Sequence, residues 1–129
     1  MTDKPAIVPY VLYRDGHVAR AFLERAFGLS TVFALNSADG ALLHAEMAHG
    51  NGVVMIGTSG EAAPGGGGIY VVVDDVDAHH ARAAAEGAAI VYPPEEAEFG
   101  TRRYCAKDVA GHEWTFGSYQ PQTTPPEGM

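Results

Sequence analysis

The second half of this chain repeats the pattern of the first half. The segment 17–21 (His-Val-Ala-Arg-Ala) returns as 79–83 (His-His-Ala-Arg-Ala), and each copy follows an apolar, strand-like segment, 7–13 and then 69–73. Each half also closes on a short hydrophobic segment that stops at a glycine, Gly57 in the first and Gly117 in the second. A repeat of this kind indicates two copies of one folding unit, in which equivalent positions have equivalent roles.

The first half predicts the element order βαβββ. Residues 7–13 are strand-like, and Pro9 places this strand at a sheet edge or at a poorly paired end. Asp15 suits the N-cap of a helix that ends near Phe27, and Gly28 suits the left-handed position after it. Three more strands are predicted at 30–35, 41–48 and 53–57, with Asn51-Gly52 as the hairpin signal between the last two.

The second half predicts the same order. Strand 69–73 leads to Asp74 and Asp75, which can cap a helix over 76–86. A strand over 88–92, a Pro93-Pro94 acidic loop, and a hairpin of 102–107 with 113–117 follow. We therefore expect one module at 1–60, a Gly-rich linker at 61–68, a second module at 69–119, and a flexible tail at 120–129.

Charge and cysteine content exclude several classes of protein. The net charge of −8 over 129 residues argues against a nucleic-acid partner, because phosphate binding needs clustered Lys and Arg. The single cysteine, Cys105, excludes an intrachain disulfide framework and fits a reducing cytosol. The start has no signal-like segment, and no apolar run approaches the ~20 residues of a membrane span. We expect a cytoplasmic protein with neither nucleic acid nor membrane as a partner.

Three segments carry a resemblance to a known family: 22–29 at the end of the first helix, 70–76, and 100–114. In this order and spacing the chain resembles the vicinal oxygen chelate superfamily, also called glyoxalase/bleomycin-resistance/dioxygenase, over roughly residues 7–119. The segment 44–47 is similar to the PhnB-like branch. The resemblance implies an α+β fold, with two tandem βαβββ modules forming curled mixed sheets around a cleft. It also implies a homodimer, in some members with modules exchanged between chains.

The resemblance also locates the metal ligands of the metal-dependent members, which are usually His, Glu or Gln on cleft-facing strands. Carried over by motif, these positions hold Val8, Met55 or Ile56, Gly68 and Thr115. None is a usual ligand for a divalent ion, and a slip of one residue brings only other poor donors. Glu113 and Tyr10 remain as unconventional ligands. We therefore expect no metal and no other cofactor.

Polar candidates for the cleft lie on two strands. His44 and Glu46 share one strand face, since side chains two residues apart point the same way. They can serve the cleft as hydrogen-bonding groups or as an acid–base pair, or lie on an exposed face or in a dimer interface. Arg102 can hold an anion through its forked donors, or pair with the nearby acidic residues 95, 96 and 98. Whether Arg102 or Arg103 faces the cleft stays open.

The remaining candidates are aromatic residues and histidines. Four aromatic side chains can form walls for a planar ligand: Tyr10, Phe33, Tyr70 and Tyr104. Trp114 and Phe116 should instead face the helix layer. Cys105 is interpreted as packing, and the histidines other than His44 are expected on exposed surfaces, including His79 and His80 on a solvated helix face. The complete set predicted for ligand binding is Tyr10, Phe33, His44, Glu46, Met55, Tyr70, Arg102, Tyr104 and Thr115.

Three functions compete on these features. The first is a metal-independent binding protein that sequesters an aromatic or antibiotic-like small organic molecule in a dimer cleft, as resistance proteins of the superfamily do. The acidic chain suits a cationic ligand. The second is a glyoxalase/dioxygenase-like lyase or isomerase that uses unconventional metal ligands or acid–base chemistry by His44 and Glu46. The third is an interaction domain whose cleft is filled by side chains. The missing ligands favour the first, and no catalytic residue is assigned.

Overall fold

The computed structural model describes residues 5–63, 65, 68–121 and 123–125. Its elements are β1 (Tyr10–Tyr13), α1 (Gly16–Phe27), β2 (Ser30–Asn36), β3 (Leu42–His49), β4 (Gly52–Thr58), β5 (Gly68–Val72), α2 (Val76–Ala85), β6 (Ala89–Glu96), η1 (Glu98–Gly100), β7 (Arg102–Lys107) and β8 (Glu113–Gly117). The order βαβββ occurs twice, so the predicted α+β fold of two modules is confirmed. Parts of the predicted linker (64, 66–67) and tail (122, 126–129) lie outside the described residues.

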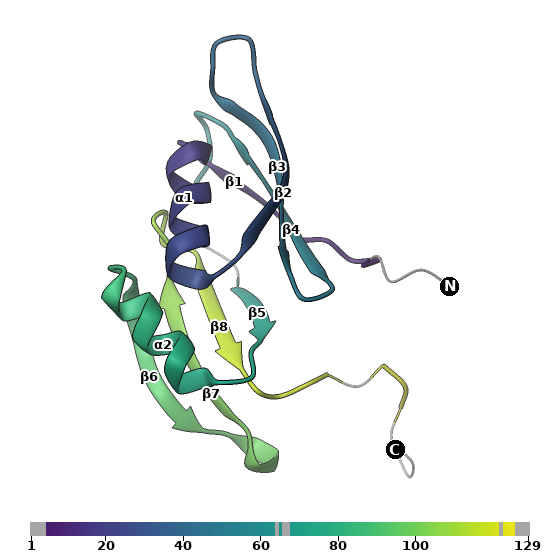
Figure 1. Ribbon diagram of the computed structural model, residues 1–129, viewed down its shortest axis with the longest axis vertical. Helices are drawn as coiled ribbons and strands as arrows, with labels where there is room; N and C mark the ends of the chain where they lie inside the picture. Colours follow the sequence, from purple (N-terminus) through teal and green to yellow (C-terminus); the bar gives the residue numbers. More distant parts are fainter. Residues whose placement is uncertain (1–4, 64, 66–67, 122, 126–129) are drawn as a thin grey trace.

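Each module is a mixed four-stranded sheet with one helix. The strand orders are β1-β4-β3-β2 and β5-β8-β7-β6, which are equivalent under the repeat. The first strand of each module runs parallel to the last, and the other neighbours are antiparallel. Figure 1 shows the modules one above the other, with α1 and α2 adjacent where they meet. The helix of each module covers one sheet face and leaves the other, which we call the open face, without a helix.

Local sequence signals set the ends of the helices as predicted. The Asp15 carboxylate accepts a hydrogen bond from the Val18 N–H at the start of α1, and the Asp75 carboxylate accepts one from the Ala78 N–H at the start of α2. These bonds satisfy amides that have no partner within the helix. Gly28, after α1, has φ +77°, a left-handed conformation that glycine adopts without steric cost.

Three predicted boundaries were wrong. The first strand begins at Tyr10 instead of residue 7. The β3–β4 connection is Gly50-Asn51, shorter than the predicted connection over 49–52, because His49 pairs with Gly52 and the positive φ of +56° falls on Gly50. The segment with Pro93 and Pro94, predicted as a loop, belongs to β6. Prolines are tolerated there because β6 is an edge strand and its pairing with β7 is irregular between Tyr92 and Glu95.

Aromatic side chains join the two modules into one core. Phe27, the last residue of α1, is fully buried and lies with its ring centroid 4.8 Å from that of Phe116 and 5.5 Å from that of Trp114. Trp114 and Phe116 on β8 therefore face the helix layer, as predicted. The repeated modules do not have separate cores, because the first helix ends inside the packing of the second module.

A buried carboxylate also links the modules. Asp108, in the β7–β8 turn, is 6% exposed. Its Oδ2 accepts hydrogen bonds from the Tyr13 hydroxyl of β1 and from Trp114 Nε1 at 3.0 Å, and its Oδ1 accepts from the backbone amides of Ala110 and His112. These donors compensate the cost of taking the carboxylate out of water. Burial, together with the neighbouring Asp108, raises the pKa of Tyr13, so Tyr13 stays a donor.

We expect Asp108→Asn to destabilise the protein by about 1–3 kcal/mol, because the amide nitrogen would face one of these donors and leave a buried group unsatisfied. The measurement is the free energy of unfolding in urea. Tyr13→Phe is the matched control, since it removes a single hydrogen bond and should cost about 1 kcal/mol. An Asp108→Asn variant as stable as wild type would show that the linkage contributes nothing to the fold.

Candidate functional site

The open face of the first module carries four of the predicted residues in one row. Strand pairing places Tyr10 beside Met55, Met55 beside Glu46, and Glu46 beside Phe33. The row crosses β1, β4, β3 and β2. Neighbours on the two inner strands, Ala45 and Ile56, turn to the other face and are buried on the side of α1, whereas Val32 beside Phe33 is 65% exposed. Residues predicted from separate segments therefore form one continuous surface.

His44 lies next to this row and contacts two of its members. Its Nε2–H donates to Glu46 Oε2 over 2.9 Å, and its ring centroid is 6.3 Å from that of Phe33. Both partners of the pair are partly exposed, so the interaction orients the imidazole and contributes little to stability. The arrangement offers a ligand a carboxylate, an imidazole and an aromatic face within one patch.

The open face of the second module carries the equivalent row. Tyr70 pairs with Thr115, Thr115 with Cys105, and Cys105 with Tyr92. Tyr70 and Thr115 thus lie together, and Tyr92 is an addition that sequence reasoning missed. Cys105 is 2% exposed, which agrees with its interpretation as a packing residue. The repeat could have found Tyr92, because it occupies the position of Phe33. Burial raises the pKa of the Cys105 thiol, which keeps it protonated.

Two strand-end glycines make room for the tyrosines of the two rows. A Cβ on Gly117 would lie 2.6 Å from the Tyr70 hydroxyl, and a Cβ on Gly57 would lie 3.3 Å from the Tyr10 hydroxyl. At the first distance the Tyr70 side chain would have to shift, so the glycine lets Tyr70 cross the end of β8 in its present position. The glycines that close each half of the sequence therefore position an aromatic side chain on each open face.

Arg102 and Tyr104, which were predicted for ligand binding, lie on the side of β7 that faces α2. The Arg102 guanidinium donates to both carboxylate oxygens of Asp77 in α2, each over 2.9 Å, and to Glu96 over 3.3 Å. Tyr104 is fully buried. Arg103 is the arginine on the open face, where it pairs with Glu95 and lies over the Tyr92 ring at 5.7 Å.

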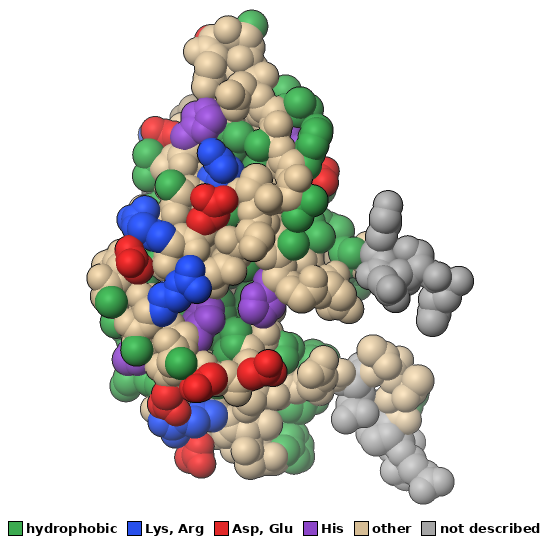
Figure 2. Space-filling view, in the orientation of Figure 1, with side chains coloured by type: hydrophobic (Ala, Val, Ile, Leu, Met, Phe, Trp, Pro, Cys, Tyr) green, Lys and Arg blue, Asp and Glu red, His purple; other side chains and the backbone are tan. Residues whose placement is uncertain are grey.

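Two histidines predicted to be exposed lie at the junction of the modules instead. His79 of α2 donates through Nε2–H to the Phe27 carbonyl over 2.9 Å and accepts at Nδ1 from the Tyr104 hydroxyl over 2.6 Å. His49 bonds through Nε2 to the Val72 carbonyl over 2.8 Å. Figure 2 shows histidine side chains at this junction. The predictions were wrong because each histidine bonds to a backbone carbonyl of the opposite module, which local sequence patterns do not reveal.

The positions that hold metal in related proteins do not fit a divalent ion in this chain. Met55 and Thr115 lie on the open faces, and Gly68 pairs with Glu113. Glu113 Oε1 lies 3.9 Å from the Cys105 thiol. Within residues 5–63, 65, 68–121 and 123–125, no group of three or more His, Cys, Asp or Glu is arranged to hold a metal ion.

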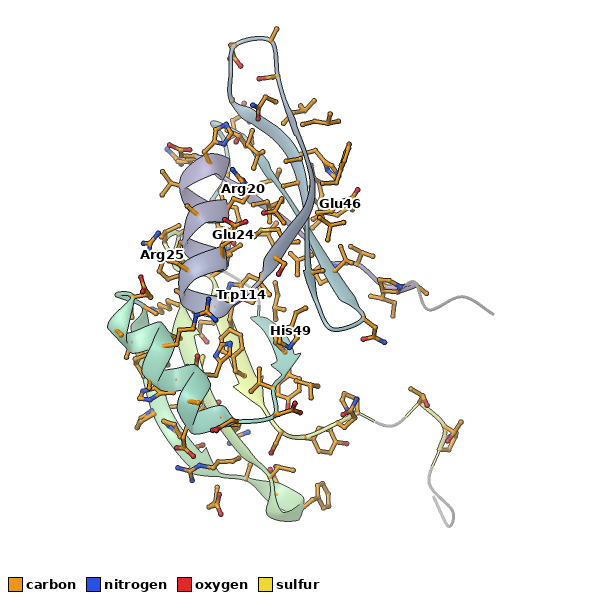
Figure 3. The ribbon with its side chains drawn as sticks, viewed as in Figure 1. Arg20, Glu24, Arg25, Glu46, His49 and Trp114 are labelled. Carbon is orange, nitrogen blue, oxygen red and sulfur yellow. The ribbon has the colours of Figure 1, made fainter. Side chains whose placement is uncertain are left out.

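A cavity of about 860 Å³ lies between the modules. Its walls come from the β3–β4 hairpin and from β5 with the start of α2. Of the residues predicted for ligand binding, only Tyr70 borders it. Figure 3 places the labelled His49 and Trp114, both of which line this cavity, at the junction.

No helix in the described part of the chain is long and apolar enough to cross a membrane.

The chain belongs to the Glyoxalase/Bleomycin resistance protein/Dioxygenase superfamily, whose sequence model matches residues 7–116. The predicted superfamily is thereby confirmed, and the PhnB-like branch stays a prediction. The crystal structure of TioX from Micromonospora sp. ML1 is 33% identical, covers 90% of this chain and 99% of its own, and superposes with a TM-score of 0.77.

Two further relatives extend the comparison. The uncharacterized protein Mb0911c of Mycobacterium bovis is 30% identical over 126 residues, which span 88% of this chain and 83% of the relative. A superfamily member from Sphaerobacter thermophilus is 20% identical and has a TM-score of 0.70, with 85% of this chain and 93% of its own covered. At that identity the likeness supports the fold alone.

The position of His79 predicts a pH dependence of stability. Burial lowers the pKa of His79, with smaller contributions in the same direction from His49 and Arg82, so the unfolded chain binds this proton more readily than the folded one. Stability is therefore fully present above the unfolded pKa of about 6.5 and falls as the pH decreases below it. Urea unfolding at a series of pH values measures the effect.

His79→Gln is the matched variant, since its amide N–H can still donate to the Phe27 carbonyl but does not titrate. We expect the loss of stability between about pH 7 and pH 5 to be smaller in His79→Gln than in wild type. Parallel profiles for the two proteins would show that another group causes the dependence.

Proposed function

We propose that this protein binds a small organic molecule on its open faces without a metal ion, and that it sequesters the ligand instead of transforming it. The observation that carries the proposal is the pair of equivalent aromatic rows, Tyr10 to Phe33 and Tyr70 to Tyr92, on faces whose family metal positions hold non-ligand residues. An aromatic or antibiotic-like ligand fits these surfaces, in keeping with the bleomycin-resistance proteins in the family's description.

The exposure of the rows supports a binding role. Tyr10 is 58% exposed, Phe33 45% and Tyr70 39%, although each is a large side chain on a regular strand. Clustered exposed apolar groups on a soluble fold mark surfaces that another molecule covers. Glu46 lies in the first row, and the chain carries a net charge of −8, so a cationic aromatic ligand has the complementary charge.

A second copy of the chain is the partner that we propose for these faces. Leu12, Leu35 and Leu43 extend the apolar surface of the first module beyond the row of aromatic residues, over more area than a small ligand needs. A second module laid over this face would bury the leucines and enclose a ligand between two rows. A cytoplasmic location, predicted from the single cysteine, belongs to the same proposal.

The contact between His44 and Glu46 favours one alternative. A carboxylate 2.9 Å from an imidazole orients the ring, which is the arrangement of a general base. On this alternative the protein is a lyase or isomerase of the family, and His44→Ala abolishes turnover. On the binding proposal, the same variant lowers affinity and there is no turnover to lose.

Ligand affinity tests the binding proposal. We expect bleomycin or the planar cation acridine orange to bind with the same affinity before and after treatment with EDTA, as measured by calorimetry. Phe33→Ala and His44→Ala should each weaken binding by roughly tenfold, the effect of removing a central contact residue. Val18→Ala, at an exposed position of α1, is the control that should bind as wild type does. Equal affinity in all three variants would contradict an open-face site.

The mass in solution tests the dimer. We expect sedimentation equilibrium to give about twice the chain mass of 13.6 kDa. Leu35→Glu places a charge in the proposed interface and should shift the protein to monomers, because an unpaired charge at an interface is costly. Val18→Glu adds the same charge on the outer side of α1 and should remain dimeric. A wild-type monomer at high concentration would contradict the proposed assembly.

A further inference from the structure

The cavity between the modules, which we call the seam cavity, is enclosed by a single chain. Its apolar walls are Leu29, Met47 and Val54 from the first module and Val72 and Trp114 from the second. Its volume of about 860 Å³ falls within the range of about 300–1,000 Å³ that is typical of small-molecule pockets. The rows on the open faces lie outside the cavity, and Tyr70 is the only one of their residues that also lines it.

The ionisable side chains that line the seam cavity are, with one exception, already bonded within the protein. His49 is bonded to the Val72 carbonyl, and both ring nitrogens of His79 are engaged. Arg82 donates to the carbonyls of Glu24 and Arg25 at the end of α1, and Asp75 caps α2. The exposed amides Asn51 and Gln120 also line the cavity. Away from them a ligand meets apolar surface, where a buried polar group would lose its water without a replacement partner.

Asp74 is the exception, and it lies at the exposed rim. Among the residues that the structure describes, its carboxylate has no ion-pair partner. We propose that the seam cavity is a second ligand site, for a small molecule with an apolar body in the cavity and an amine that reaches Asp74. This site goes beyond the proposed function, because it needs neither the open faces nor a second chain.

Trp114 provides a direct reporter of this site. It is the only tryptophan of the chain, it is fully buried, and it lines the cavity. Bromine quenches tryptophan fluorescence at short range, so a bromoaryl compound in the cavity, next to the buried indole, is detected without a label. The probes are para-bromobenzylamine, para-bromobenzyl alcohol and para-bromobenzoate, which share a ring and differ in charge.

We expect saturable quenching with the affinity order amine, alcohol, benzoate. The amine should bind roughly two- to fivefold more tightly than the alcohol, the range for one exposed ion pair. Asp74→Asn should remove this preference and leave the affinity for the alcohol unchanged. Ala78→Phe places a ring into the cavity from α2 and should abolish saturable quenching by all three probes.

Ala84→Phe is the matched control, because it adds the same ring at an exposed position of the same helix outside the cavity lining. Three results would overturn the proposal: no saturable quenching in wild type, equal quenching in Ala78→Phe and Ala84→Phe, or an amine preference that survives in Asp74→Asn. Quenching that is abolished by Phe33→Ala and not by Ala78→Phe would assign these probes to the open face instead. That result would overturn the seam site and leave the proposed function standing.

Discussion

The arrangement of the two modules depends on a buried carboxylate, Asp108, that accepts hydrogen bonds from β1 and β8. Its bond to Tyr13 crosses from the second module to the first, and its bond to Trp114 fixes the indole that packs on Phe27. His79 adds a second crossing at the other end of the same aromatic cluster through the Phe27 carbonyl. Since buried polar groups are costly unless paired, these contacts favour one relative placement of the modules. That placement creates both the seam cavity and the orientation of the open faces.

The repeat explains why the protein has two similar open faces, to which we assign the proposed ligand binding. Each open face has a tyrosine on its first strand, held across a strand-end glycine, and an aromatic residue on its outer strand. The middle positions differ: Glu46 and Met55 in the first module correspond to Cys105 and Thr115 in the second. Both faces also carry charged side chains, since Arg103 and Glu95 form an ion pair on the open face of the second module.

Much of the fold could be predicted from the sequence, because caps, glycines and alternating strands act locally. Asp15, Asp75 and Gly28 mark helix ends without reference to the rest of the chain. The residues of the candidate site were harder to predict from the sequence than the fold. Because side chains alternate along β7, Arg102 and Arg103 point to opposite faces of the sheet. Only the position of Asp77 on α2 decides which of them faces the helix. His49 and His79 were misplaced for the same reason, since their partners are backbone carbonyls of the opposite module. The seam cavity has no sequence signal, because it arises from the packing of segments far apart in the chain.

We propose that this member of the superfamily acts without a metal ion at the positions that correspond to the family's metal ligands. The most direct test is the metal content of untagged protein, purified without chelator and then offered Ni, Zn, Mn and Fe(II), with unbound ions removed before elemental analysis. If the protein acts without metal, we expect far less than one equivalent of any of these metals per chain. One tightly held equivalent per chain would contradict it, and would direct attention to Glu113, His44 and Glu46 as ligands.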